Sequence, residues 1–177
     1  MTVPAYIGVG SNAEPEENIP RAMGCLREKV EVTATSTFYK TKPLAGRQEQ
    51  PAYLNGVWKV AAREDQGPRV IKEVLKDIES RLGRVRSADR YAQRTIDLDL
   101  LLYGTDVVAE RDLRIPDPDI YIRPFVGIPL AELDPLLVLP DTGRSIQEVV
   151  RSFGAPDMEP QEDFTLSLRR LLSSKEC

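Results

Sequence analysis

The sequence contains no histidine, and this absence excludes several kinds of catalytic site. Serine–histidine and cysteine–histidine catalysis need an imidazole as the general base, and histidine-ligated zinc needs one as a ligand. Only two cysteines are present, Cys25 and Cys177, which support neither a disulfide framework nor a thiolate metal site. The chemistry is therefore left to carboxylates, arginines and hydroxyl groups, and the low cysteine content fits a reducing cytoplasm.

Long apolar runs and an excess of basic residues are also lacking. No stretch approaches the roughly 20 apolar residues of a membrane span, and the opening MTVPAYIGVG lacks the regions of a signal peptide. The formal net charge is −4, whereas a general nucleic-acid binder depends on a broad basic surface. We expect a cytoplasmic protein that has no membrane or nucleic-acid partner.

The order of the patterned segments predicts an α+β fold. Strands are indicated by β-rich runs bounded by turn residues, and helices by apolar residues at helical spacing, with Gly83 as a stop for the second helix. The order β-α-β-β-α-β, with a β hairpin and further helices appended, matches the ferredoxin-like plan, in which helices cover one face of a mainly antiparallel sheet. The predicted strands are 4–12, 31–41, 53–62 and 94–104, the predicted hairpin is 105–116, and the predicted helices are 15–30 and 67–84.

RTIDLDLLLYG, residues 94–104, places Asp97 and Asp99 one residue apart in an otherwise apolar run. Side chains on a strand repeat every second residue, so both carboxylates project from one face with Cα atoms about 6.5 to 7 Å apart. We expect them to repel each other unless cations neutralise them, and Mg²⁺ prefers hard oxygen ligands of this kind. The alternative is that both aspartates are simply solvated on the outer face of an antiparallel sheet.

A basic stretch, GRVRSADRYAQR, lies immediately upstream and supplies Arg84, Arg86, Arg90 and Arg94 against one acid, Asp89. Such clusters are usually only solvated. Beside a carboxylate pair, however, arginines indicate a site for phosphoryl transfer. In such sites metal ions bridge phosphate oxygens and arginines neutralise developing charge. The expected ligand is a nucleoside triphosphate, held by side chains and metals because the P-loop pattern GxxxxGK[ST] is missing.

GRVRSADRYAQRTIDLDLLLYG resembles the signature of the 6-hydroxymethyl-7,8-dihydropterin pyrophosphokinase family of folate biosynthesis. Further matching segments are YIGVGSN, STFYKTKPLAGRQEQPAYLNGV and IPDPDIYIRPFVGIPLAELDP, so the resemblance covers roughly residues 4–140. It implies a three-layer α-β-α ferredoxin-like fold and transfer of diphosphate from ATP to the pterin hydroxymethyl group, with two Mg²⁺ ions and AMP leaving. We expect a catalytic domain at 1–155 and a C-terminal tail at 156–177 that forms one helix.

The resemblance also implies roles for individual residues. Asp97 and Asp99 correspond to the metal ligands, and Tyr53 and Phe125 to two rings that stack on the flat pterin, although ordinary core packing is the alternative for both. The implied catalytic residues are Arg84, Arg94, Asp97 and Asp99; the implied ATP-binding residues are Glu79, Arg84, Arg86, Arg94, Asp117 and Arg123; and the implied pterin-binding residues are Thr41, Pro43, Leu44, Tyr53, Asn55 and Phe125.

Two of these residues leave alternatives open. Glu79 lies near the nucleotide or simply pairs with a nearby arginine. Asp117 stands in IPDP, where family members usually have the histidine of IPHP, so a cation beside the phosphates becomes an anion that repels them. We expect its side chain to turn away and accept a hydrogen bond from its own loop rather than to bind Mg²⁺.

Two other functions compete with phosphoryl transfer. A degenerate homologue would bind nucleotide or pterin as a regulatory module, as Asp117 suggests, but retention of both Asp97 and Asp99 argues against it. A ferredoxin-like RNA-binding domain would display aromatic residues on its sheet, whereas TIDLDLLLY shows acids there. The sequence therefore favours an enzyme that acts on ATP and a hydroxymethyl pterin as a monomer or weak homo-oligomer.

Overall fold

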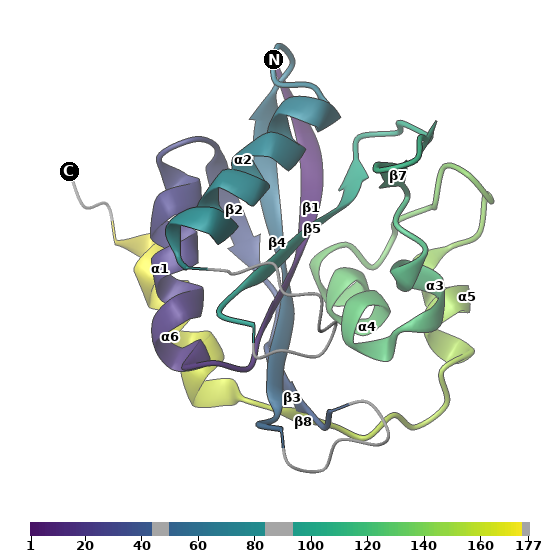
Figure 1. The fold of residues 1–177 in the computed structure, drawn as a ribbon. Helices are drawn as coiled ribbons and strands as arrows, with labels where there is room; N and C mark the ends of the chain where they lie inside the picture. The colour runs from purple at the N-terminus through teal and green to yellow at the C-terminus, as the bar shows by residue number, and fades with distance from the viewer. Residues whose placement is uncertain (44–49, 84–93, 175–177) are drawn as a thin grey trace.

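The computed structural model describes residues 1–43, 50–83 and 94–174, which form one sheet between two helical layers (Figure 1). Over these residues, none of the helices is long and apolar enough to cross a membrane. The strands are β1 (Thr2–Ser11), β2 (Glu31–Thr35), β3 (Tyr39–Thr41), β4 (Tyr53–Arg63), β5 (Asp97–Tyr103), β6 (Val108–Ala109), β7 (Arg114–Ile115) and β8 (Met158–Pro160). The helices are α1 (Pro15–Arg27), α2 (Pro68–Arg81), α3 (Asp119–Ile122), α4 (Pro124–Leu133), α5 (Ile146–Arg151) and α6 (Glu162–Ser173).

The main sheet is antiparallel and has the order β5-β1-β4-β3-β8, with β2 also paired to β4. Strand β1 lies between β4 and β5, and β3 lies between β4 and β8. The predicted hairpin forms a separate two-stranded sheet from β6 and β7. The structure confirms the predicted α+β class and its mainly antiparallel sheet.

Helices α1, α2 and α6 cover one face of the sheet. The helical spacing predicted for α2 is confirmed, because Ile71, Leu75 and Ile78 are almost fully buried against the sheet. The predicted stop is confirmed as well: α2 ends at Arg81, and Gly83 follows with a positive φ of 82°, which glycine adopts at little cost.

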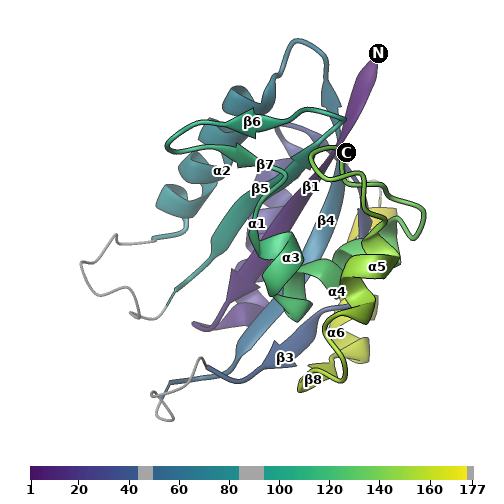
Figure 2. The ribbon, with the colours of Figure 1, turned by 90° about the vertical axis from the view of Figure 1, so that its right-hand side faces the viewer.

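Helices α3, α4 and α5 cover the opposite face, as Figure 2 shows from that side. Their apolar side chains, among them Ile120 and Leu130, pack against Tyr6, Val57 and Leu101 of the sheet. The β-α-β-β-α-β order accounts for helices on one face only. Helices α3 to α5, which follow the hairpin, supply the third layer that the family resemblance implies. The side chains that β5 directs to this face therefore lie on the side of the sheet that carries the second helical layer.

The predicted β-rich run 31–41 is interrupted in the structure, where β2 ends at Thr35 and β3 begins at Tyr39. Between them Phe38 turns into the core, is fully buried, and lies against Gly56 of β4. The ring takes the space that a side chain at position 56 would occupy, so the break depends on a glycine in the neighbouring strand. Alternation within the run itself does not reveal this contact.

Gly56→Ala is expected to destabilise the protein by about 1 to 3 kcal/mol, the usual cost of overpacking a core. A Cβ at this position would lie 2.6 Å from ring atoms of Phe38, which is closer than carbon atoms can pack. The matched control is Gly24→Ala in α1, where a Cβ meets nothing within 4 Å. Helix propensity should make that variant roughly 0.5 to 1 kcal/mol more stable.

Urea unfolding of both variants measures the two effects. Equal stability of Gly56→Ala and the wild type would contradict the close packing of Phe38 on β4.

Candidate active site

Asp97 and Asp99 project from the same face of β5, the face that carries α3, α4 and α5. Asp97 is partly buried and Asp99 is exposed, whereas Leu98 and Leu100 are buried in the core on the opposite face, as the alternation predicted. We expected the two carboxylates to repel each other unless cations neutralise them. One such cation is Arg94, whose Nη1 lies 2.6 Å from Asp97 Oδ2 and compensates its charge.

Two glycines of β1 open the space beside these carboxylates. Gly8 pairs with Asp99 and Gly10 pairs with Asp97 in the antiparallel ladder. On its other side Gly10 pairs with Asn55 of β4, and a Cβ at Gly10 would lie 2.9 Å from Asn55 Oδ1. The alternating glycines of YIGVG therefore leave a floor of bare backbone between the carboxylates and Asn55.

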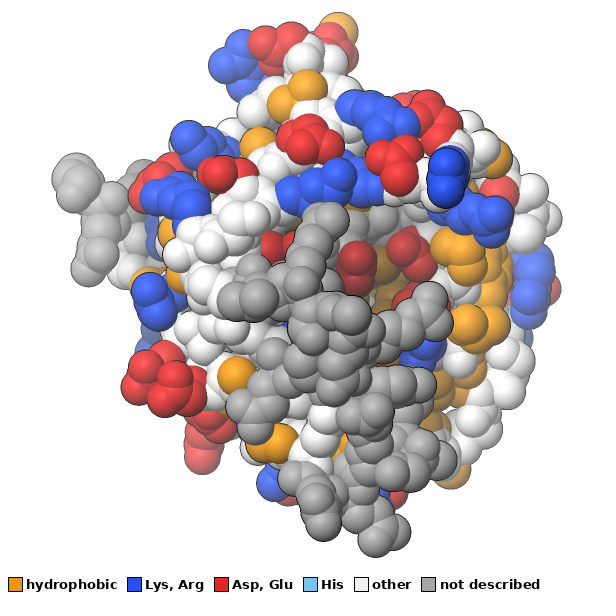
Figure 3. All heavy atoms as spheres, in the orientation of Figure 1, with side chains coloured by type: hydrophobic (Ala, Val, Ile, Leu, Met, Phe, Trp, Pro, Cys, Tyr) orange, Lys and Arg blue, Asp and Glu red, His pale blue; other side chains and the backbone are white. Residues whose placement is uncertain are grey.

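Two cavities meet at the carboxylates. The first, of about 240 Å³, lies over β1, β4 and α4 and is lined by Gly10, Tyr53, Asn55 and Phe125. The second, of about 370 Å³, lies between α2, β5 and the β6–β7 hairpin. Both are lined by Asp97, Asp99 and Asp117, and Figure 3 shows acidic side chains inside the hollow on this face.

Of the six residues with an implied pterin role, five line the first cavity: Thr41, Pro43, Tyr53, Asn55 and Phe125. Leu44 lies outside the described residues. Asn55 Nδ2 donates to Thr41 Oγ1 at 2.8 Å, and both side chains are buried, so the amide is held in one orientation. Tyr53 and Phe125 are each partly buried, which leaves part of each ring available to the cavity.

The arginines with implied roles are only partly described. Arg84 and Arg86 lie outside the described residues. Arg94 and Arg123 both line the first cavity, from the β5 side and the α4 side respectively. Arg123 is oriented by an ion pair with Asp119 at 3.0 Å, and its guanidinium lies 5.7 Å from the centroid of the Phe125 ring.

Arg94 is anchored by the Gly-Ser-Asn turn at residues 10–12, which closes the predicted first strand. The Arg94 N–H donates to Asn12 Oδ1 at 2.7 Å, and the Asn12 N–H donates to the Arg94 carbonyl at 3.2 Å. Ser11 Oγ donates to the Thr95 carbonyl at 2.7 Å. Ser11 and Asn12 are buried polar residues at the end of the predicted first strand, and the local sequence does not indicate that they bind the backbone of Arg94 and Thr95.

Glu79 makes a contact with β5 that was not predicted from the sequence. Its carboxylate is buried, with 5% of the residue exposed, and Oε1 accepts a hydrogen bond from the Leu98 N–H at 2.8 Å. Glu79 also lines the second cavity together with Lys72 and Lys76 of α2. It therefore ties α2 to the strand between the two aspartates, in addition to any contact with a ligand or an arginine.

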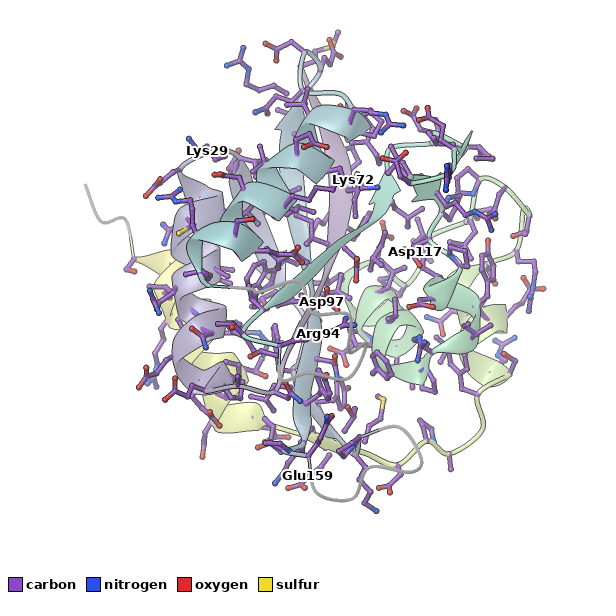
Figure 4. The ribbon with its side chains drawn as sticks, viewed as in Figure 1. Lys29, Lys72, Arg94, Asp97, Asp117 and Glu159 are labelled. Atoms are coloured by element: carbon purple, nitrogen blue, oxygen red, sulfur yellow. The ribbon has the colours of Figure 1, made fainter. Side chains whose placement is uncertain are left out.

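Asp117 makes the hydrogen bond within its own loop that we predicted, since Oδ1 accepts from the Asp119 N–H at 2.8 Å. Figure 4 shows Asp117 across from Asp97, on the side of α3. Among the described residues, no three carboxylate or cysteine side chains are grouped closely enough to hold a metal ion, so Asp117 does not form a cluster with the two aspartates of β5. Burial raises the pKa of Asp117 above its ordinary value.

A raised carboxyl pKa means that the fold disfavours the charged form of Asp117, so stability is lost as the pH rises through that pKa. Asp117→Asn keeps the Oδ1 acceptor and removes the charge. We expect the variant to melt at a higher temperature than the wild type at pH 7, and the difference to shrink in acid, where the wild-type carboxyl is also neutral.

Thermal melts across this pH range measure the difference. The same substitution at Asp77, which is exposed on α2, is the control and should change the midpoint little at either pH. A difference that grows toward acid pH would refute the account of Asp117.

The sequence is similar to proteins of a known family. The sequence model of the family described as 7,8-dihydro-6-hydroxymethylpterin-pyrophosphokinase (HPPK) matches residues 6–135. The chain is 40% identical over 154 residues to the 2-amino-4-hydroxy-6-hydroxymethyldihydropteridine pyrophosphokinase of Haemophilus influenzae, covering 85% of this chain and 93% of that protein. It is 38% identical over 148 residues to the enzyme of the same name from Pseudomonas aeruginosa, covering 82% of this chain and 88% of that protein.

Solved structures show the same fold. The wild-type HPPK-DHPS of Plasmodium falciparum with pteroate aligns with a TM-score of 0.68 at 12% identity, over 86% of this chain. The chain spans only 44% of the length of that solved protein. This similarity therefore concerns the three-layer fold alone.

Proposed function

Because the chain belongs to the 7,8-dihydro-6-hydroxymethylpterin-pyrophosphokinase family, we propose that it transfers a diphosphate from ATP to the hydroxymethyl group of 6-hydroxymethyl-7,8-dihydropterin. The products are AMP and the pterin diphosphate, in a step of folate biosynthesis. The observation that carries the proposal is the meeting of two cavities at Asp97 and Asp99. Two substrates in these cavities would present their reacting groups to each other beside the carboxylates.

The first cavity has the chemistry of a pterin site. Tyr53 and Phe125 offer aromatic faces for stacking, and Asn55 offers amide groups for the edge of the ring. The bond from Asn55 to Thr41 fixes the amide before the substrate arrives, which reduces the entropy lost on binding. A flat heteroaromatic molecule with polar edges fits these features.

The second cavity has the chemistry of a triphosphate site. Lys72 and Lys76 of α2 and Arg114 of β7 line it with cationic side chains. Lys72 has only 19% of its side chain exposed and lies 3.7 Å from Asp112, so its ammonium group is directed toward the hairpin side of the cavity. We place the ATP phosphates between these cations and the carboxylates of β5.

The donor set at the junction of the cavities fits Mg²⁺. Asp97 and Asp99 offer hard oxygen ligands, and phosphate oxygens and water would complete the coordination of the two ions that we propose. Mg²⁺ held by Asp97 and Asp99 would supply positive charge against the phosphate groups. Arg94 and Arg123 are placed at the first cavity to neutralise charge on the transferred group.

The reaction follows from positioning and electrostatics. The pterin hydroxymethyl oxygen attacks the β-phosphorus of ATP in line with the bond to the α-phosphate, AMP leaves with the electrons of that bond, and the hydroxyl proton is released to solvent. Positioned arginines and lysines stabilise the charge on the phosphoryl oxygens, and in this reaction class positioning and charge neutralisation supply most of the rate enhancement.

We further propose that the protein works on these small molecules in the cytoplasm as a monomer or weak homo-oligomer, without a nucleic-acid or membrane partner.

The test of the proposed function incubates the protein with ATP, Mg²⁺ and hydroxymethyl-dihydropterin and separates the nucleotide products. AMP is expected, in an amount equal to the pterin diphosphate formed. ADP as the product would indicate single phosphoryl transfer, and ligand binding without any product would indicate the regulatory module instead.

Asp99→Asn should lower kcat by several orders of magnitude while the fold is retained, because it removes the charge of a proposed metal ligand without changing its size. The matched control is Asp77→Asn on the exposed face of α2, which should leave kcat unchanged. Circular dichroism of both variants checks the fold. Near-normal turnover of Asp99→Asn at saturating Mg²⁺ would remove Asp99 from the metal site.

Asp117→His should tighten ATP binding by about tenfold, or about 1.4 kcal/mol, because it replaces a repulsive carboxylate by a hydrogen-bond donor. Titration calorimetry with a non-hydrolysable ATP analogue at several Mg²⁺ concentrations measures the change. Weaker binding with a higher Mg²⁺ requirement would show instead that Asp117 is a metal ligand.

A further inference from the structure

The chain beyond residue 135, where the family match ends, contributes β8 and α6 to the body of the protein. Strand β8 extends the main sheet beside β3, and α6 lies beside α1 on one face of that sheet (Figure 1). Leu168 of α6 is buried in the core, and an Arg27 guanidinium N–H of α1 donates to the Leu171 carbonyl at 2.9 Å. The C-terminal segment is therefore firmly attached next to the strand that carries Thr41.

Phe38, the residue before β3, depends on this segment for both of its backbone polar groups. Its N–H donates to Thr165 Oγ1 at 2.9 Å, and its carbonyl accepts from the Gln161 N–H at 2.8 Å. Phe38 is fully buried and Thr165 is 1% exposed, so water cannot replace either partner. A buried N–H that loses its acceptor is costly, and the chain would shift to recover one.

The hydroxyl of Thr165 is itself held in place for this contact. It donates to the Gln161 carbonyl at 2.8 Å while it accepts from Phe38, so both of its hydrogen-bonding functions are used. The neighbouring Phe164 meets the ring of Phe38 edge-on, with centroids 5.6 Å apart and planes at 81°. One turn of α6 thus holds both the backbone and the ring of Phe38.

The strand that follows Phe38 reaches the first cavity, which Thr41 lines. Strand β3 begins at the next residue and pairs Tyr39 with Asn55 and Thr41 with Tyr53 of β4. The buried hydrogen bond from Asn55 to Thr41 joins the same two strands. Strand β5, which carries Asp97 and Asp99, is separated from β3 by β4 and β1. A shift of β3 would therefore disturb the Asn55 side of the site and leave the carboxylates in place.

We propose that Thr165 is a positioning residue for pterin binding, which it serves by fixing Phe38 and, through β3, the Thr41–Asn55 pair. This inference rests on the proposed function, because it takes the first cavity as the pterin site. In this proposal α6 stabilises the half of the active site that carries Asn55, although α6 contributes no residue to the lining of either cavity.

The test is Thr165→Val, which keeps the size of the side chain and removes its hydroxyl. Steady-state kinetics varies hydroxymethyl-dihydropterin and MgATP separately, well below the melting temperature of the variant. The KM for the pterin should rise about fivefold, equivalent to about 1 kcal/mol, while the KM for ATP stays within about twofold of the wild type. Thr165→Ser, which restores the hydroxyl, should restore the KM for the pterin.

The control is Ser167→Ala, which removes an exposed hydroxyl of α6 that bonds only within the helix, to the Phe164 carbonyl. It should change neither KM. A Thr165→Val enzyme with both KM values unchanged, or with both raised equally, overturns the role of Thr165, and so does an equal effect of Ser167→Ala. If Thr165→Val does not fold, Thr165→Ala carries the same test, since it also removes the hydroxyl and places no methyl group against the Phe38 N–H.

Failure of the proposed function looks different. A wild-type protein that forms no AMP from ATP and the pterin refutes that function and this inference together, whereas an active wild type without the split in KM refutes the role of Thr165 alone.

Discussion

The pairing of β1 with β5 is the constraint on which the site depends. It sets Gly8 opposite Asp99 and Gly10 opposite Asp97, so that two carboxylates stand beside two positions without side chains. A one-residue slip would turn the aspartates into the apolar core and the leucines into the cavities. The bond from Glu79 to the Leu98 N–H and the turn at Ser11 and Asn12 hold β5 at its start.

Each of the two helical layers contributes to a different cavity. Helix α2 packs on the leucine face of β5 and also forms a wall of the second cavity, whereas α1 packs on β1 and β2, and α6 packs on β2. Helices α3 and α4 complete the first cavity, with Arg123 and Phe125 at the start of α4. A ligand in either cavity would therefore contact both the sheet and a helix, with the carboxylates shared between the two.

Much of this could be predicted from the sequence, because the signals are local. The alternation around Asp97 and Asp99 predicted which face each residue takes, and the helical spacing in α2 together with Gly83 predicted that helix and its end. The break at Phe38 and the anchoring of Arg94 by Asn12 could not be predicted, because each depends on residues far away in the chain. The ion pair of Arg94 with Asp97 was not predicted either, because Arg94 was assigned to the phosphates of a nucleotide and not to the neighbouring carboxylate.

The contact between Phe38 and Thr165 joins residues 127 positions apart, and this has a consequence for synthesis on the ribosome. Strands β1, β4 and β5 and the helices packed on them can form as soon as residue 133 or so has emerged, but β3 gains its outer partners only when residues 158–165 follow. Because domains begin to fold while the chain is still being made, the half of the site that carries the aspartates can form first. The half that carries Asn55 is completed only when residues 158–165 have been translated.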